Sequence, residues 1–438
     1  MLLRFRVENY ASLLDEQELS LIASGESEGL ATTVVPSANL SVLPVAAIFG
    51  ANAAGKSNAL LALAYMRDVV LDSHRRWLPD GGVQRVPFLL SRRGKDEPST
   101  FITDMVVGGV RYEYGFSVND ECVLEEWLYS YPHQRRRVLF ERWERRFRYG
   151  DSFAGRRKLI EDIVRPNSLY LSAGASNSHP LLSDLYRWFR QHVKIATDDN
   201  YGARLYETIH QWQNRDGGRI ERLLRFADLG VESLKLSDQS FDEETIRRAV
   251  QAMRVIVPEF KDADALEKDL KSLRRLRLIH RGSDGPVPLH PSFESSGTRT
   301  WAGLLGPIVS ALDDGGVLVI DELDARLHPH LAARLIGLFQ DPKINRHGAQ
   351  LIFNTHDATL LAPHSEARLR RDQVWVAEKD AGDKESGMAG ATQLIPLIEY
   401  RPRDRVENLE KRYLAGRYGG VPYFDDELIE DLASVGRE

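Results

Sequence analysis

The stretch from Gly50 to Ser57, GANAAGKS, constrains the fold of this 438-residue chain more than any other feature. It fits the pattern G-x4-G-K-S, in which glycines allow several backbone N–H groups to point at one phosphate chain. An apolar run, residues 42–49, comes directly before it, and residues 57–70 have the composition of a helix. A buried strand, a glycine-rich loop and a helix N-terminus together favour bound phosphate. We therefore expect an α/β fold with a parallel-sheet core.

The side chains of this loop predict a nucleotide site. Lys56 is expected to reach the outer phosphates, and the Ser57 hydroxyl is expected to bind Mg²⁺. Asn52 occupies a position from which a side chain can face the γ-phosphate and water. Ala53 stands where many such loops carry glycine, and we expect this to cost little because a negative φ suits alanine. The residues expected to contact the nucleotide are Gly50, Asn52, Ala53, Ala54, Gly55, Lys56, Ser57 and Asn58.

Two later strand-like runs supply candidate catalytic residues. Residues 317–320 are apolar and end in Asp321 and Glu322. Asp321 is expected to hold the Mg²⁺ shell, and Glu322 to orient or deprotonate the attacking water. A second apolar run, residues 350–354, is followed by Thr355 and His356, and this histidine is positioned to contact a γ-phosphate or water. Either run alone is also typical of an ordinary buried strand. The catalytic interpretation therefore depends on the order of the two runs after the loop.

The rest of the pattern divides the chain into four parts. Residues 1–175 contain the loop and a set of antiparallel strands, with a hairpin turn at Gly108-Gly109 and a small-residue loop over 172–178. Residues 176–284 are mostly helical in pattern and are predicted to be an insertion. Residues 285–400 return to apolar strands and complete the core, and residues 401–438 form a charged tail.

Composition limits the classes of function. The hydrophobic content is 42%, the charged content is 28% and the net charge is −6, which is ordinary for a globular protein without an overall basic balance. The single cysteine, Cys122, cannot form a disulfide framework. The start lacks the apolar segment of a signal peptide, and no long apolar span lies near the loop. We expect a cytoplasmic protein with no membrane partner.

Two basic stretches raise the question of nucleic acid. Residues 133–158 hold ten Arg or Lys against three acids, with Trp143, Phe147 and Tyr149 between them, and residues 271–281 hold a second cluster. Cations with interleaved aromatics suit DNA or RNA contact. The same pattern also suits a solvated strand pair in which arginine stems cover apolar surface. Both interpretations stay open at the level of sequence.

The order of the three motifs resembles the ABC-type ATPase head. Residues 293–298, FESSGT, look like the signature loop of that class, and residues 323–329, LDARLHP, look like its D-loop. The opening, MLLRFRVENYASLLDEQELSL, is similar to RecF- and SMC-like ATPases of the overcoming-lysogenization-defect (OLD), abortive-infection and Septu type. The tail KRYLAGRYGGVPYF resembles members encoded beside a RloB-like partner. The expected fold is thus an ABC-type head with a parallel P-loop core, an antiparallel β subdomain and a helical insertion.

The resemblance implies a mechanism shared between two chains. ATP and Mg²⁺ would lie between two protomers, with the loop of one chain gripping the phosphates. Ser295 and Gly297 of the other chain would cap the γ-phosphate. A monomer would then hold half of each site, so ATP binding and self-association would be linked in a dimer or a larger homo-oligomer.

Three functions fit these features. The first is an ATP-hydrolysing sensor and scaffold in antiphage defence that controls a separate effector, such as a RloB-like, TOPRIM or HNH nuclease. The second is a RecF-like ATPase of DNA repair or recombination. The third is a nucleotide-gated assembly protein that does not hydrolyse ATP. Glu322 separates the third from the others, because only hydrolysis requires this carboxylate.

Overall fold

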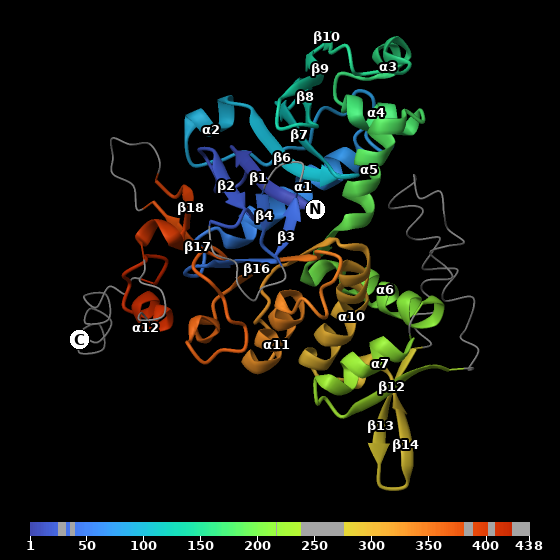
Figure 1. Cartoon of the computed structure of the whole chain (residues 1–438), viewed down its shortest axis with the longest axis vertical. Coiled ribbons are helices and arrows are strands. Elements are labelled where there is room, and N and C mark those ends of the chain that lie inside the picture. Colours follow the sequence, from blue (N-terminus) through green and yellow to red (C-terminus); the bar gives the residue numbers. More distant parts are fainter. Residues whose placement is uncertain are drawn as a thin grey trace, which may run out of the picture.

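The computed structural model describes residues 1–24, 32–35, 40–215, 217–237, 276–380, 389–401 and 408–422. A six-stranded sheet forms the centre of this part of the chain (Figure 1). Its strands, in spatial order, are β11 (Val193–Ala196), β15 (Val317–Ile320), β16 (Gln350–Thr355), β5 (Val45–Phe49), β17 (Val374–Lys379) and β18 (Thr392–Pro396). Five of them are parallel, and β18 pairs antiparallel with β17.

The central strands are apolar because both faces of the sheet are covered. Every residue of β5, β15 and β16 is buried. Ala46 and Ile48 of β5 pack in one core with α1 (Lys56–Asp72), whereas Val45, Ala47 and Phe49 pack in a second core. The second core also contains α10 (Ser296–Asp314) and α11 (Pro329–Gln340). Continuous hydrophobicity, rather than alternation, is what a strand between two helix layers requires.

A seven-stranded antiparallel sheet forms the other β part, at the top of Figure 1. Its strands, in spatial order, are β10 (Arg146–Tyr149), β9 (Arg137–Trp143), β8 (Val123–Tyr131), β7 (Val110–Val118), β6 (Ser99–Val107), β1 (Leu2–Glu8) and β2 (Gln17–Ser20). The hairpin turn expected at Gly108-Gly109 joins β6 to β7, and both glycines have positive φ. The expected fold class, a parallel core with an antiparallel β part and helices, is confirmed.

One buried glutamine joins the two sheets. The backbone N–H of Leu2 in β1 donates to Gln350 Oε1 at 2.7 Å, and Gln350 Nε2 returns a hydrogen bond to the Leu2 carbonyl at 2.7 Å. Gln350 opens β16 and is 1% exposed. Because its amide satisfies both backbone groups of Leu2, β1 is held at the start of the strand that ends in His356.

The prediction of a small-residue loop over 172–178 is wrong. Residues Tyr170–Ser176 form helix α4, which packs against α5 (Pro180–His192). A Cβ on Gly174 would lie 2.2 Å from Leu182 Cδ1, so the small residues allow close helix packing. Serine, alanine and glycine in a short run do not by themselves distinguish a loop from a tight helix contact.

The range predicted as a helical insertion is mixed in structure. It contains the helices α5, α6 (Tyr201–Asn214) and α7 (Gly217–Phe226), but also β11, a member of the central sheet. A small antiparallel sheet follows, made of β12 (Val231–Leu236), β13 (Leu276–Gly282) and β14 (Gly285–Leu289). Residues 238–275 of this range lie outside the described part. β13 and β14 form a hairpin with its turn around residues 282–285.

The remaining elements are short. They are β3 (Thr33–Val35), β4 (Leu40–Val42), α2 (Arg92–Asp96), α3 (Arg157–Ile163), α12 (Leu409–Leu414) and the 3-10 turns η1 (Asp198–Asn200), η2 (Pro291–Phe293), η3 (Ala358–Leu361) and η4 (Leu397–Tyr400). Within the described ranges, no helix has both the length and the apolar character needed to span a membrane.

A buried ion pair fixes the antiparallel sheet to α4. Arg142 of β9 and Glu126 of β8 lie 3.3 Å apart, with side chains 1% and 0% exposed. Glu126 also accepts hydrogen bonds from the backbone N–H groups of Tyr170 and Leu171, at 2.6 and 2.9 Å. Burial raises the pKa of Glu126, and the nearby Arg142 opposes that rise.

We predict that Arg142→Met lowers the free energy of unfolding by about 3 kcal/mol or more, because it leaves a buried carboxylate without its cation. Urea denaturation measures the change. Arg92→Met is the matched control, since Arg92 and Asp96 form an exposed pair with side chains 95% and 68% exposed. That control should cost no more than ~0.5 kcal/mol. Equal losses in the two variants would contradict the assigned role of Arg142.

Candidate nucleotide-binding site

The carboxyl ends of three neighbouring parallel strands meet at one edge of the central sheet. β16 lies between β5 and β15, with Thr355 opposite Phe49 and Phe353 opposite Ile320. The loop 50–55 follows β5, Asp321 follows β15, and His356 follows β16. Ligands of open α/β sheets bind at this edge. The topology therefore brings the loop together with two motifs that lie roughly 270 and 300 residues later in the sequence.

The lysine of the loop is the centre of this cluster. Lys56 Nζ donates to the carbonyls of Gly50 and Ala51, at 2.8 and 2.9 Å, and lies 3.1 Å from His356 Nδ1. Burial lowers the pKa of Lys56 to about 8, while the charges of Asp324, Glu322 and Asp321 oppose this shift. The predicted phosphate ligand, the predicted γ-phosphate contact and the acidic strand end therefore lie together.

The back of the loop rests on side chains from both ends of the chain. A Cβ on Gly55, which has φ +92°, would lie 2.0 Å from Thr392 Oγ1 and 2.5 Å from Ser12 Oγ. Thr392 Oγ1 donates to the Ala54 carbonyl at 2.9 Å and lies 2.7 Å from Ser12 Oγ. Asn58, predicted to contact the nucleotide, donates its side-chain amide to Ser12 Oγ at 2.7 Å. Glycine is required at position 55 because this support leaves no room for a side chain.

A residue that the sequence interpretation missed connects the predicted magnesium ligands. Asn354, the fifth residue of β16, is fully buried. Its Nδ2 donates to Ser57 Oγ at 3.1 Å and to Asp321 Oδ1 at 2.6 Å. Its Oδ1 accepts the backbone N–H of Glu322. The only signal in the sequence is an amide that follows the apolar residues LIF, directly before Thr355 and His356.

The acidic segment after β15 has a strained backbone. Glu322 has φ +54° and an exposed side chain, and its position is fixed by the hydrogen bond to Asn354. A left-handed conformation costs an ordinary residue roughly 1–2 kcal/mol. Asp324 accepts the backbone N–H of His356, with Oδ2 at 3.2 Å. Strain of this kind occurs where surrounding contacts hold a residue in a functional position.

The donor groups fit Mg²⁺ and a phosphate chain. Ser57 and Asp321 present a hydroxyl and a carboxylate, the hard oxygen ligands that Mg²⁺ takes in phosphate sites. A Cβ at Gly50 would lie 2.6 Å from the Ala377 carbonyl, so this end of the cradle also excludes side chains. The exposed residues Asn52 and Ala53 form the open side of the loop. The roles of these residues toward a nucleotide remain predictions.

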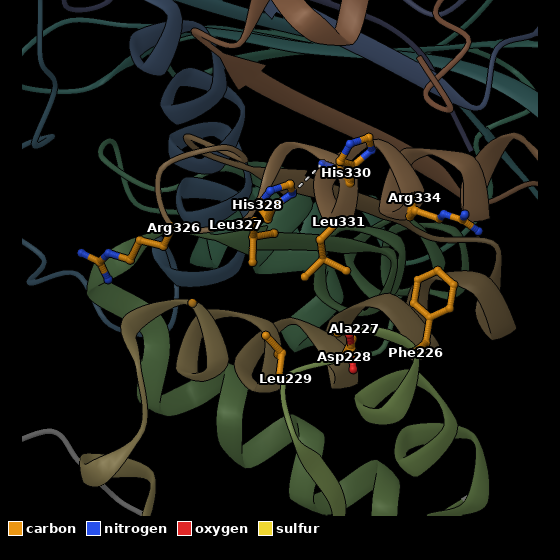
Figure 2. Close-up of a pocket in the computed structure, with 11 residues that line it drawn as sticks. Phe226, Ala227, Asp228, Leu229, Arg326, Leu327, His328, His330, Leu331 and Arg334 are labelled. Carbon is orange, nitrogen blue, oxygen red and sulfur yellow. Dashed lines mark hydrogen bonds between the residues drawn. The ribbon is translucent and has the colours of Figure 1, made fainter. Parts of the chain in front are cut away.

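The signature-like loop, residues 293–298, lies beside Arg326. Ser295 caps α10, accepting the backbone N–H of Thr298 at 3.0 Å. A Cβ on Gly297 would lie 2.8 Å from the Arg326 carbonyl. Gly297 also lines a cavity of about 650 Å³ between the turn after α7 and the start of α11, where Leu229, Leu327 and Leu331 lie between Arg326 and Arg334 (Figure 2). Both predicted cap residues therefore belong to the surface beside the D-loop.

The expectation that Ala53 has a negative φ is wrong, because its φ is +61°. The loop requires a left-handed residue here, and alanine meets this requirement at a cost of roughly 1–2 kcal/mol. Glycine would adopt the same conformation without that cost. The glycine found at this position in many such loops thus has a conformational reason that the sequence pattern alone did not reveal.

We predict that Ala53→Gly raises the free energy of unfolding by about 0.5 kcal/mol, since relief of strain outweighs the greater flexibility of glycine in the unfolded chain. ATP turnover should stay within a few-fold. Ala51→Gly is the matched control, because Ala51 is outside the set of described residues with positive φ. That variant should lose stability. A loss of stability in Ala53→Gly as large as in the control would show that strain is absent.

Solved structures with a similar fold are SMC heads. The SMC head domain from Thermotoga maritima matches with a TM-score of 0.40 and 12% identity, covering 90% of this chain and 98% of that chain. An Smc head bound to the C-winged helix domain of ScpA matches with a TM-score of 0.42 and 12% identity, covering 90% and 96%. An Smc head from Pyrococcus furiosus, bound to the C-terminal domain of ScpA, matches with a TM-score of 0.34 and 10% identity, covering 90% and 95%. No curated protein matches the sequence.

A family model identifies the chain more directly. The model is described as "AAA domain, putative AbiEii toxin, Type IV TA system", and it matches residues 45–362. This range includes the loop, the Asp321-Glu322 strand and His356, and it covers more than half of the chain. The chain therefore belongs to this family and carries an AAA domain with a P-loop.

Proposed function

We propose that this protein binds and hydrolyses ATP at sites shared between two copies of the chain, and that the resulting association controls a separate effector in antiphage defence. The observation that carries the proposal is the division of the motifs in one chain. Lys56, Ser57, Asp321 and His356 lie in one linked cluster, whereas Gly297 lies against Arg326 and Ser295 caps α10. A second protomer would supply the missing half.

We propose a separate role for each residue of the cluster. Lys56 leaves the carbonyls of Gly50 and Ala51 to bind the β- and γ-phosphates. Mg²⁺, held by Ser57 and Asp321, would neutralise charge on the phosphate oxygens. Glu322 orients the attacking water and accepts its proton. His356, 3.1 Å from Lys56, contacts the γ-phosphate and responds to its loss.

The role in defence rests on resemblance and on family membership. The opening residues and the tail are similar to those of OLD, abortive-infection and Septu-type ATPases, and the family is described as containing a putative AbiEii toxin. We propose a RloB-like, TOPRIM or HNH nuclease as the effector. Homo-oligomers larger than a dimer are compatible with this scheme, and the proposed location is the cytoplasm.

The RecF-like alternative has one observation in its favour. This sheet edge has a basic surface, made of the exposed residues Arg137, Arg146, Arg148 and Arg156. Two features weaken it as a nucleic-acid site. Arg142 is buried, and Phe147 and Tyr149 stack with each other at 6.2 Å and contact Tyr170, so these rings serve packing. Residues 271–275 of the second basic stretch lie outside the described part. DNA binding at low salt that fades as salt is raised would favour this alternative.

Glu322→Gln tests the proposed turnover and association together. We expect ATP hydrolysis to fall at least ~100-fold, because the general base is lost. The variant should accumulate as an ATP-bound dimer or larger oligomer in analytical ultracentrifugation, while Lys56→Ala should not respond to ATP. Unchanged behaviour of Glu322→Gln would instead favour the non-hydrolysing assembly protein. Co-purification with the trapped form would identify the effector.

Mixing two inactive variants tests whether the site is shared. Lys56→Ala removes the phosphate ligand from one chain, and Ser295→Arg blocks the cap of the other. In a two-fold dimer of the two variants, one composite site remains intact. An equal mixture should therefore recover about a quarter of wild-type turnover. A mixture as inactive as its components would argue that each chain completes its own site.

Asn354→Asp tests the amide that connects the cluster. The variant keeps an acceptor for the Glu322 N–H but loses the donors to Ser57 and Asp321, and it places a second carboxylate beside Asp321. Loss of buried hydrogen bonds and like-charge repulsion should lower kcat at least ~10-fold. The dependence of turnover on Mg²⁺ concentration measures the defect. Asn345→Asp, at another buried asparagine, is the control for the general cost of such a change.

A further inference from the structure

We infer that the segment Asn408–Pro422 is part of the nucleotide site, because Tyr413 and the Gly419-Gly420 turn position the first residue of the phosphate loop. The inference rests on the proposed binding of ATP at that loop. In Figure 1, α12 lies beside the central sheet, far in sequence from β5. Two described residues of the segment, Tyr413 and Gly420, reach Gly50 directly.

Tyr413 connects the loop to the turn through its hydroxyl. The ring is 5% exposed and meets Phe49, the last residue of β5, in an edge contact at 5.8 Å. The hydroxyl donates to the Gly420 carbonyl at 3.0 Å. Burial raises the pKa of Tyr413 to about 12, and a hydrogen bond with the Gly50 backbone opposes the rise.

The two glycines allow the turn to approach the loop closely. Gly420 has φ +65°, and a Cβ there would lie 3.3 Å from Gly50 Cα and 2.5 Å from Val376 Cγ1. Its N–H donates to Glu378 Oε1 at 2.9 Å. A Cβ on Gly419 would lie 1.7 Å from the same oxygen. Both positions thus require glycine for space as well as for conformation.

Gly50 stands between this segment and the catalytic lysine. Its Cα lies close to Gly420, and its carbonyl accepts Lys56 Nζ at 2.8 Å. When Lys56 turns to a phosphate it gives up that carbonyl, so the close approach of the Gly419-Gly420 turn keeps Gly50 in place. The Ala377 carbonyl lies beside both Gly50 and Gly420. Displacement of the segment would therefore release the first glycine of the cradle.

A segment that only completes the hydrophobic core would affect stability but not the affinity for ATP at a given temperature. Tyr413→Phe separates these roles, because it keeps the ring against Phe49 and removes only the hydroxyl. We expect the KM for Mg-ATP to rise about fivefold, as for one lost hydrogen bond, with kcat little changed. Gly420→Ala should raise KM further, since its Cβ meets the loop.

Gly416→Ala is the matched control for the conformational cost. Gly416 has φ +73°, close to that of Gly420, but a Cβ there would meet only Val421 Cγ2, at 3.3 Å. This variant should lose similar stability and keep the wild-type KM. Equal KM values in Gly420→Ala and Gly416→Ala, or no change in Tyr413→Phe, would overturn the inference.

Hydrogen exchange in nucleotide-free protein keeps the inference separate from the proposed function. Amides of residues 50–58 should exchange at least several-fold faster in Tyr413→Phe and Gly420→Ala than in wild type or in Gly416→Ala. If wild-type protein fails to bind Mg-ATP, the proposed function fails, and faster exchange at the loop still supports positioning by the segment. Exchange that is equal in all four proteins contradicts the inference, whatever the affinity for ATP.

Discussion

The pairing of β16 with both β5 and β15 is the constraint on which the site depends. This strand brings the glycine loop near residue 50 to the carboxylates near residue 321, and it is followed by the histidine that contacts Lys56. Its Asn354 hydrogen-bonds both Ser57 and Asp321. A slip of β16 by one residue would turn Asn354 to the other face of the sheet, because side chains alternate between faces. The register of β16 therefore decides whether the site forms.

The sequence predicted the elements that repeat a strong local pattern. The apolar runs before Gly50, Asp321 and His356 are the parallel strands, and Gly108-Gly109 is a hairpin turn, because hydrophobic continuity and turn chemistry are encoded in adjacent residues. Asn354 and Tyr413 were not identified, since their roles arise from partners far away in the sequence. Asp321 and Ser57 lie 33 and 297 residues before Asn354, and Gly50 lies more than 300 residues before Tyr413. The loop prediction for residues 172–178 was wrong because small residues are needed there for close helix packing against Leu182.

Strain within the site follows from the same arrangement. Ala53 and Glu322 both have left-handed backbones. Glu322 is held by its hydrogen bond to Asn354, and Ala53 lies in a loop anchored by Gly50 and Gly55. Two such residues cost a few kcal/mol, which the buried strands must offset. This conformational cost has a functional reason, because backbone N–H groups and a carboxylate must all face one ligand.

The loop is shaped from behind by residues of both chain ends before any phosphate arrives. Ser12 and Thr392 support Gly55, while Tyr413 and Gly420 support Gly50. The two glycines of the motif are therefore required because neighbouring residues leave no room for a side chain, as well as for binding phosphate. A binder preorganised in this way loses less entropy when the ligand enters. These contacts also make the position of the phosphate loop depend on Ser12, Thr392, Tyr413 and Gly420. A partner that binds and moves these residues would therefore change the affinity for nucleotide.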